Sequence, residues 1–492
     1  MVIGAIFYHS GWALLGLCAL IAIPLTHALA TGAAGAAWAL AMTLSLCGFV
    51  GGAFLFSLRP RRGTQLDLAR VRLAVVVIGW LTLSVCAGLP FYFSLAIPTF
   101  HGAIFEGASA LTTTGSTALA SVSETPPPLL LWRALLQWVG GLATILTVAV
   151  LLAPARRNED PKFGALQIGH LAREGAWLPR AAKTVIIPGY LALTAIAVFG
   201  LALGGLPWFD ALCVGLAAAA TGGMLPADGD FARYGSLLGT LVVGLVFALS
   251  AVSALWLRGL LTLQWRGLKD FIEPVWLFLI LGLTALLIAS SLLGRGQELP
   301  LAVIAWELAL SFATAASLVS TAGMEITERT VLLIPFVLMV LLILIGGGRF
   351  SSAGGLKYFR VLAMLRHGMN ELQHLIYPTS VKGLRSERGA RDADVITVIW
   401  ANFAFVIMLV FGFAMLVSLD NIDLPLALLM SVSALSNFGP GFIAAAAPNE
   451  LVANPYAGLS PVVHYGLAIA MVLGRLEIIA LLTLFNRAFW RF

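Results

Sequence analysis

Charged residues are scarce in this chain, and their scarcity excludes most soluble classes of protein. Only 11% of the 492 residues are Asp, Glu, Lys or Arg, whereas 60% are hydrophobic. Soluble domains carry about 25% charged and about 45–50% apolar residues. The chain also lacks a long polar block, because apolar stretches recur from Gly11 to Phe485. The sequence therefore predicts an all-α polytopic membrane protein.

Groups that would support catalysis or cofactor binding are missing as well. The four cysteines lie singly in apolar runs, and none of the seven histidines pairs with a cysteine or carboxylate at metal-ligand spacing. The glycine-rich stretches GGLATI and GGGRFSSAGG lack the strand–turn–helix context of a nucleotide site. We therefore expect no enzyme and no cofactor in this chain. The short basic clusters between apolar runs indicate membrane topology, so we expect no nucleic-acid partner.

Apolar runs long enough to cross a lipid bilayer occur ten times. A membrane helix needs about 20 mostly apolar residues, and the predicted spans are 11–30, 35–58, 70–94, 129–153, 184–204, 236–257, 274–294, 329–347, 393–419 and 461–485. Most of the 29 Lys and Arg residues lie on one side of these spans. The positive-inside rule makes that side cytoplasmic and places both termini there.

Four further apolar segments, each too short to cross comfortably, form a repeat. They are 102–113, 209–220, 303–319 and 424–436. The predicted orientation is self-consistent only if these segments enter and leave by the outer face, which makes them re-entrant. We take the glycines that end them as Gly115, Gly222, Gly323 and Gly439.

This repeat predicts four helix–pore helix–filter–helix units around one pore, preceded by an extra N-terminal helix pair. The predicted boundaries are 1–62 for the helix pair and 63–165, 166–270, 271–391 and 392–492 for the four units.

Non-helical backbone at membrane depth limits the functions that this chain can have. Lipid satisfies no free N–H or C=O groups, so such breaks must be buried in protein or line a wet pathway. Four breaks around one axis would direct carbonyl oxygens to a common centre, as in a filter that replaces the hydration shell of a monovalent cation. Acidic residues in the outer segments would attract cations to the mouth. In the alternative interpretation, the glycines form tight turns with no ligand.

Six motifs carry a resemblance to a known family. They are TTTGST at 112–117, WVGG at 138–141, IGGGRFSSAGGLK at 345–357, ELQHLIYP at 371–378, NFGPG at 437–441 and GRLEI at 474–478. In this order they resemble the TrkH/KtrB (Trk/Ktr/HKT) superfamily of potassium-uptake subunits. The extra helix pair at 11–58 is similar to that of the TrkH branch. The resemblance implies a gated, channel-like protein for potassium-selective uptake across the cytoplasmic (inner) membrane of a bacterium.

The resemblance also implies which residues bind potassium. In the superfamily the carbonyls of the two residues before each filter glycine coordinate the ion, which implies here Thr113, Thr114, Ala220, Thr221, Thr321, Ala322, Asn437 and Phe438. Glycine at all four filter positions is associated with potassium preference, whereas serine at the first is typical of sodium-permeable plant relatives. Gly115 therefore implies potassium.

A gate beneath the filter is implied by two features. The segment 345–355 resembles an intramembrane loop that obstructs the pore in the superfamily, and its residues implied in gating are Gly346, Gly347, Gly348, Arg349, Gly354 and Gly355. Arg349 and Phe350 depart from the small residues typical there. Arg475, near the bilayer midplane, resembles an arginine just below the filter that slows ion exit, and a charge at that depth marks a functional site by default. The alternatives are a packing kink for the loop and a salt bridge, for example with Glu477, for the arginine.

The resemblance further implies a homodimer that sits on a cytosolic nucleotide-binding ring of the TrkA type. The charged loops at 155–183 and 366–392 are candidate docking segments, or simply interfacial. Two other functions stay open, a proton- or sodium-coupled potassium symporter and an intramembrane enzyme. Intramembrane carboxylates are few beyond Glu477, which favours channel-like flux. The lipid bilayer and the potassium ion are the remaining expected partners.

Overall fold

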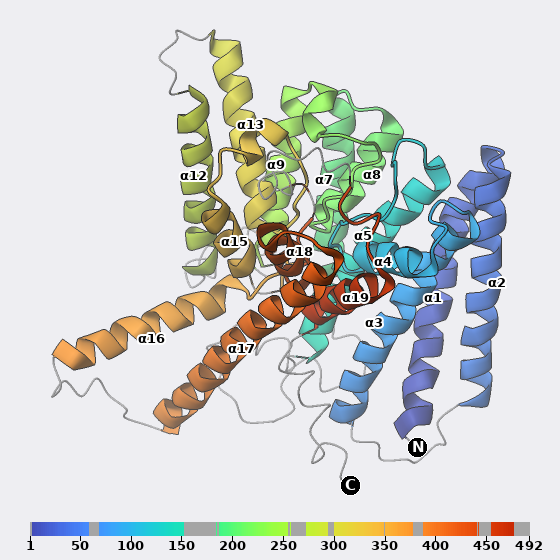
Figure 1. The fold of residues 1–492 in the computed structure, drawn as a ribbon, viewed down its shortest axis with the longest axis horizontal. Helices are drawn as coiled ribbons and strands as arrows, with labels where there is room; N and C mark the ends of the chain where they lie inside the picture. Colours follow the sequence, from blue (N-terminus) through green and yellow to red (C-terminus); the bar gives the residue numbers. More distant parts are fainter. Residues whose placement is uncertain are drawn as a thin grey trace.

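The structure is a computed structural model, and it is built from helices (Figure 1). It describes residues 2–58, 68–151, 184, 186–253, 256, 272–293, 300–348, 350–376, 387–439, 441 and 454–476. Its helical content agrees with the predicted all-α class.

The N-terminal helices α1 (Val2–Ala30) and α2 (Ala34–Ser57) form an antiparallel pair at one side of the molecule (Figure 1). They cross closely because glycine faces glycine: a β-carbon added at Gly11 would lie 2.9 Å from the carbonyl oxygen of Gly51. Helix α1 packs in turn against α3 (Leu68–Phe93) and α5 (Pro127–Leu151). The predicted extra helix pair therefore exists and contacts the rest of the bundle.

Within the described residues, seven helices are long and apolar enough to cross a membrane. Besides α1, α2, α3 and α5, they are α12 (Ile272–Leu293), α13 (Leu301–Val319) and α17 (Glu387–Val417). Six of the ten predicted spans correspond to one of these helices. The seventh helix, α13, corresponds to the segment 303–319. The prediction that this segment is too short to cross a membrane is therefore wrong, because α13 is long enough.

The other four predicted spans contain shorter helices. They are α7 (Ile187–Leu203), α9 (Leu237–Ala251), α15 (Phe336–Ile345) and α19 (Pro461–Arg475). The single span predicted over 329–347 is wrong. The one-turn helix α14 (Glu328–Val331) is separated from α15, which begins directly after Pro335. Helices α9 and α19 end where Val252 and Leu476 adopt extended backbone.

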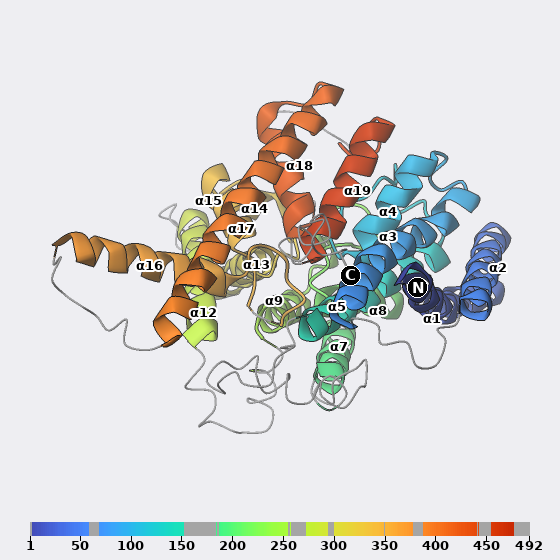
Figure 2. The same ribbon diagram turned by 90° about the horizontal axis from the view of Figure 1, so that it is seen from below.

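Four inner helices correspond to the predicted short segments: α4 (Phe100–Leu111), α8 (Trp208–Ala219), α13 and α18 (Leu424–Ser436). Each packs on the helix that precedes it in the chain, α4 on α3, α8 on α7, α13 on α12 and α18 on α17. Seen from below, the four inner helices lie around a common centre (Figure 2). Their buried faces are rich in Ala, Ser and Gly, which allows the helix ends to approach one another.

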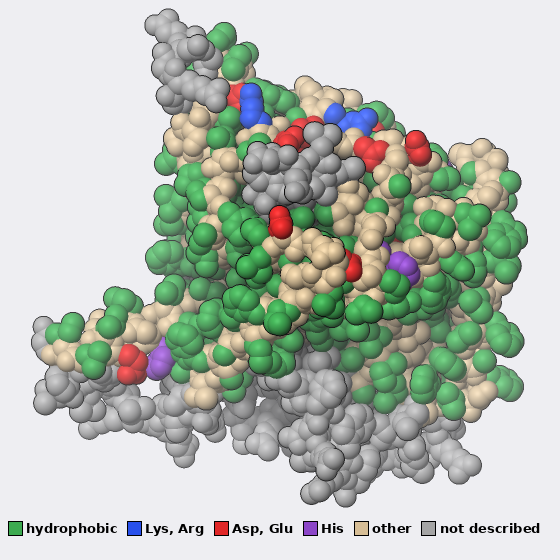
Figure 3. Space-filling view, in the orientation of Figure 1, with side chains coloured by type: hydrophobic (Ala, Val, Ile, Leu, Met, Phe, Trp, Pro, Cys, Tyr) green, Lys and Arg blue, Asp and Glu red, His purple; other side chains and the backbone are tan. Residues whose placement is uncertain are grey.

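The outer surface of the bundle is apolar. Phe56, Leu203 and Met415 are 94%, 81% and 75% exposed, and hydrophobic side chains are widespread over the middle of the visible face, whereas most of its charged groups lie near the upper rim (Figure 3). An exposed apolar belt of this extent is what a lipid-facing surface requires. Together with the seven long apolar helices, it identifies a multi-pass membrane protein.

Helix α16 (Tyr358–Ile376) differs from the others because it projects away from the bundle (Figures 1 and 2). It carries exposed apolar side chains together with charged ones such as Arg366 and Glu371. The predicted docking segment 366–392 begins on this helix. The other docking segment, 155–183, lies outside the described residues, and the boundaries of the four units stay predictions.

Candidate functional site

The four inner helices end in the same unusual turn. Directly beyond their last turns lie Thr113, Thr221, Thr321 and Asn437, whose φ angles are +56°, +54°, +59° and +48°. Each of these residues donates its N–H to the carbonyl three positions earlier, on Ala110, Ala218, Leu318 and Ala434 respectively. Left-handed backbone is a genuine outlier for β-branched threonine. Strain that recurs at equivalent places points to a functional site.

We name the three residues that begin at each left-handed position the turn segments: 113–115, 221–223, 321–323 and 437–439. Each ends in glycine, at Gly115, Gly223, Gly323 and Gly439. These glycines meet: a β-carbon added at Gly115 would lie 3.3 Å from the Gly223 nitrogen and 3.4 Å from the Gly439 α-carbon. One added at Gly323 would overlap the Gly439 backbone, and one added at Gly223 the Ala322 carbonyl. The four turn segments therefore converge on one constriction.

The register of the second turn segment differs by one residue from the sequence-based alignment. That alignment takes Gly222 as the partner of the other three glycines, whereas the backbone places Gly223 there. Ala220 is the residue that caps α8, and its carbonyl accepts the hydroxyl of Thr221 at 2.7 Å. Gly222 faces the side chain of Gln137 on α5. Two consecutive glycines fit the motif equally well, and only the end of α8 decides between them.

The segment between α15 and α16 folds back beneath the turn segments as a non-helical loop. Gly346 and Gly355, at φ +69° and +76°, bring its two ends together. The N–H of Gly354 donates to Thr321 Oγ1 at 2.6 Å, and that of Gly348 donates to the carbonyl of Ala251 at 2.9 Å. A β-carbon at Gly354 would overlap the carbonyl of Ser436. The loop thus contacts the ends of α13, α18 and α9, while Arg349 lies outside the described residues.

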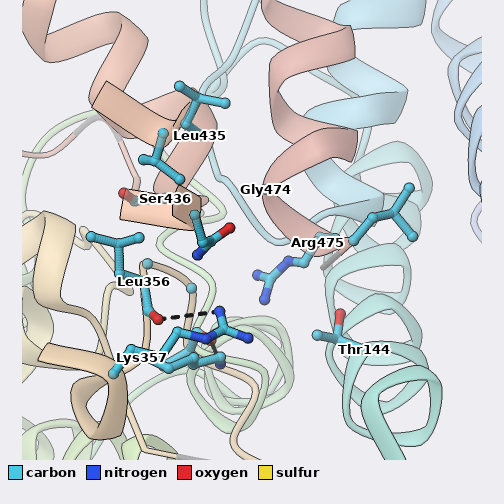
Figure 4. Close-up of a pocket in the computed structure, with 14 residues that line it drawn as sticks. Thr144, Leu356, Lys357, Leu435, Ser436, Gly474 and Arg475 are labelled. Carbon is cyan, nitrogen blue, oxygen red and sulfur yellow. Dashed lines mark hydrogen bonds between the residues drawn. The ribbon is translucent and has the colours of Figure 1, made fainter. Parts of the chain in front are cut away.

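Arg475 links this loop to the first turn segment. It is the last residue of α19, is 4% exposed, and points into a cavity lined by Thr144, Leu356, Lys357 and Ser436 (Figure 4). Its Nε donates to the carbonyl of Thr112 and its Nη1 to that of Ser352, both at 2.5 Å, and its Nη2 donates to the hydroxyl of Thr113. These partners are neutral oxygens, and Glu477 lies outside the described residues. The guanidinium therefore holds the loop and the constriction together.

We name the mouth segments 116–126, 224–236 and 324–335, which follow the first three turn segments, together with 454–460, which precedes α19. Two of them are tied together because Asp228 accepts the N–H groups of Val122 and Ser123 at 2.8 and 2.9 Å. Glu325 lies two residues after Gly323 and is half-buried. Burial and the nearby Asp230 and Glu328 raise the pKa of the Glu325 carboxyl to about 7.

Two contacts between side chains in the first and last units are not predictable from the sequence. Glu106 and Arg133, both buried, are ion-paired at 2.8 Å, and Glu106 also accepts the N–H of Ala118. The Nδ1 atoms of His101 and His464 are 2.8 Å apart, which joins α4 to α19. The two members of each pair are 27 and 363 positions apart in the sequence, so no local spacing predicts that they meet.

Inner helices that converge on one constriction within a helical membrane protein are typical of a transport protein. The chain belongs to the TrkH family of cation transport proteins, whose family model matches residues 41–188 and 319–491.

Proteins similar to this chain carry consistent names. The Trk system potassium uptake protein TrkH of Salmonella typhimurium is 30% identical over 444 residues and covers 88% of both chains. TrkH of Escherichia coli K12 is 28% identical over 442 residues with the same coverage. TrkI of Halomonas elongata is 28% identical over 85% of this chain and 83% of its own. These relatives are named as transport proteins and not as enzymes.

A solved structure shares the fold. The crystal structure of the potassium transporter TrkH from Vibrio parahaemolyticus matches all of both chains with a TM-score of 0.81 at 24% identity. The helical architecture described above is therefore that of a TrkH protein.

Proposed function

We propose that this chain mediates potassium uptake across the cytoplasmic membrane of a bacterium, with the four turn segments as its filter. The observation that carries the proposal is the convergence of four left-handed turns, each followed by glycine, on one constriction. The names of the relatives support potassium as the ion. Backbone carbonyls grouped around one axis are suited to replace the water shell of a monovalent cation.

The proposed potassium ligands follow the structural register. They are the carbonyls of Thr113, Thr114, Thr221, Gly222, Thr321, Ala322, Asn437 and Phe438. Ala220 leaves this set because it caps α8 and precedes the left-handed residue Thr221, so the second position of the turn segment falls to Gly222.

The loop 346–355 and Arg475 form the proposed gate. The loop lies against the ends of three units, and Arg475 places a cation beside the proposed ion path. A fixed positive charge close to the path opposes the passage of a second cation. Channel-like flux through this gate is the function that we favour over coupled symport.

The same proposal includes the orientation of the chain in the membrane and its partners. The mouth faces outward, both termini are cytoplasmic, and the chain acts as a homodimer with a cytosolic nucleotide-binding ring of the TrkA type. The relatives support a partner in that their names place them in a Trk system.

Expression in a cell that lacks potassium uptake, grown at low potassium, tests the proposal. The wild-type chain with its regulator should rescue growth, and Gly115→Ser should lower the preference for potassium over sodium about tenfold. The reason is that Gly115 has φ +88° and that an added side chain would crowd the Gly223 nitrogen, 3.3 Å away. Gly205→Ser is the matched control, because Gly205 has φ +90° and no neighbour within 4 Å. Failure of the wild-type chain to rescue, or an unchanged preference in Gly115→Ser, contradicts the proposal.

Uptake from dilute potassium should depend on the pH at the mouth. The pKa of Glu325 is raised to about 7, so its carboxyl is mostly neutral at pH 6 and mostly ionised at pH 8. Uptake should therefore rise about two- to threefold from pH 6 to pH 8, because the ionised carboxylate attracts cations. Glu325→Gln should remove this rise, whereas Glu124→Gln, at an exposed mouth position, should retain it. The same rise in Glu325→Gln would assign the pH dependence to another group.

A further inference from the structure

Helix α5 lies directly behind two of the turn segments. A β-carbon at Gly140 would overlap the carbonyl of Leu111, the last residue of α4, and one at Gly141 would lie 2.8 Å from the β-carbon of Ala220 at the end of α8. The glycine pair of the WVGG motif thus allows the backbone of α5 to approach both inner helices. Gln137 lies one turn earlier on the same helix.

Gln137 fills a place that the second turn segment leaves vacant. The middle residue of the turn segments is Thr114, Ala322 or Phe438 in three cases, but Gly222 in the second. A β-carbon at Gly222 would lie 2.6–2.7 Å from the Cδ, Nε2 and Oε1 atoms of Gln137. The carboxamide therefore occupies the space in which the missing side chain would begin.

The carboxamide of Gln137 is buried and unpaired. The residue is 0% exposed, and neither Oε1 nor Nε2 has a hydrogen-bond partner among the residues that the structure describes. A buried amide without a partner is destabilising, and an apolar side chain of the same size would avoid that cost. The presence of glutamine here therefore points to a hydrogen bond made in another state of the filter.

The other turn segments already have such side-chain bonds. Thr114 Oγ1 accepts the Asn437 side-chain amide at 3.1 Å, which joins the first and fourth segments, and Thr321 Oγ1 accepts the N–H of Gly354. In the second segment, the hydroxyl of Thr221 is bonded to the adjacent carbonyl of Ala220. In the part of the chain that the structure describes, the second segment thus has a buried amide donor without a partner, that of Gln137, placed against it.

We propose that Gln137 is a positioning residue for the second turn segment and contributes to the preference for potassium over sodium. Its Nε2 donates to a backbone carbonyl of segment 221–223 when the carbonyls turn toward a bound cation. A carbonyl oxygen has two lone pairs, so it can accept this bond and face the ion together. A segment held in this way is less free to close around the smaller sodium ion. The inference rests on the proposed filter function and deepens it.

Gln137→Met tests the role of the amide, since methionine keeps the length of the side chain and removes its polar atoms. We expect the maximal rate of potassium uptake to stay within about twofold of the wild-type rate. The apparent affinity for potassium and the preference over sodium should each fall about 3- to 10-fold, the effect of one lost hydrogen bond. Wild-type affinity and preference in Gln137→Met would overturn the proposal.

Gly222→Ala and its combination with Gln137→Ala test the contact itself. Gly222→Ala should lower the thermal stability and membrane abundance of the protein, because its β-carbon overlaps the carboxamide. The added change Gln137→Ala should restore both, without restoring the potassium preference. Equal stability of the single and double variants would overturn the proposed contact. If the wild-type chain moves no potassium, the filter function fails, and this stability comparison still decides whether the contact exists.

Discussion

Gly323→Ala should abolish cation uptake while leaving the helical bundle in the membrane. Gly323 has φ +62°, a conformation that costs alanine about 1–2 kcal/mol. An added β-carbon would also overlap the backbone nitrogen of Gly439 and lie 2.6 Å from its carbonyl oxygen. Because the obstacle is backbone, it moves only if the fourth turn segment moves too. The constriction would then lose its geometry, although the surrounding helices keep their contacts.

Gly235→Ala separates crowding from backbone strain in this prediction. Gly235 has φ +60°, almost the same as Gly323, but no atom lies within 4 Å of an added β-carbon. Its variant should cost a similar amount of strain and retain uptake near the wild-type level. Rubidium uptake, normalised to the amount of protein in the membrane, is the measurement. Wild-type uptake by Gly323→Ala would place this glycine outside the ion path.

Arg475→Ala should raise the basal cation flux about tenfold or more in the absence of the regulator. The guanidinium holds Ser352 of the loop and Thr112 and Thr113 of the first turn together, so its removal frees the loop. Its removal also takes a positive charge away from the proposed ion path. At an effective dielectric constant of about 20, two unit charges about 4 Å apart interact by about 4 kcal/mol, so a tenfold change, about 1.4 kcal/mol, requires only a fraction of such an interaction.

Two further substitutions distinguish the charge from the link. Arg475→Lys keeps the charge but has no fork that reaches all three oxygens, whereas Arg475→Gln keeps hydrogen bonding without the charge. If the link closes the gate, the lysine variant leaks as the alanine variant does; if the charge does, the glutamine variant leaks and the lysine variant stays closed. Flux in proteoliposomes measures each. A basal flux in Arg475→Ala equal to that of the wild-type protein would remove Arg475 from the gate.

The sequence predicts most of the architecture because the bilayer restricts it so strongly. Long apolar runs become helices, and six of the ten predicted spans appear as membrane-length helices. The short segments at 102–113, 209–220 and 424–436 appear as the inner helices α4, α8 and α18, since Ala and Ser favour close packing and a glycine lies shortly beyond the end of each helix. The described glycine-rich residues 346–348 and 350–355 are non-helical, because glycine disfavours a continuous helix.

What the sequence misses depends on contacts between distant residues. The sequence does not distinguish Gly222 from Gly223 as the filter glycine. The hydrogen bond from the Thr221 N–H to the Ala218 carbonyl at the end of α8 sets the register. The helix break at Pro335 lies within an apolar run that is predicted as one span, and α13 is longer than the short segment predicted there. Gln137, His101 and His464 gain their neighbours only when α5 meets α8 and α4 meets α19.

Uptake of radioactive rubidium by liposomes that contain the purified chain tests the potassium filter most directly. Potassium added outside should compete with rubidium at concentrations at least tenfold lower than sodium, and Gly323→Ala liposomes should show no uptake above empty liposomes. Equal competition by sodium and potassium, or equal uptake by the wild-type and Gly323→Ala proteins, would contradict a potassium filter at the four turn segments.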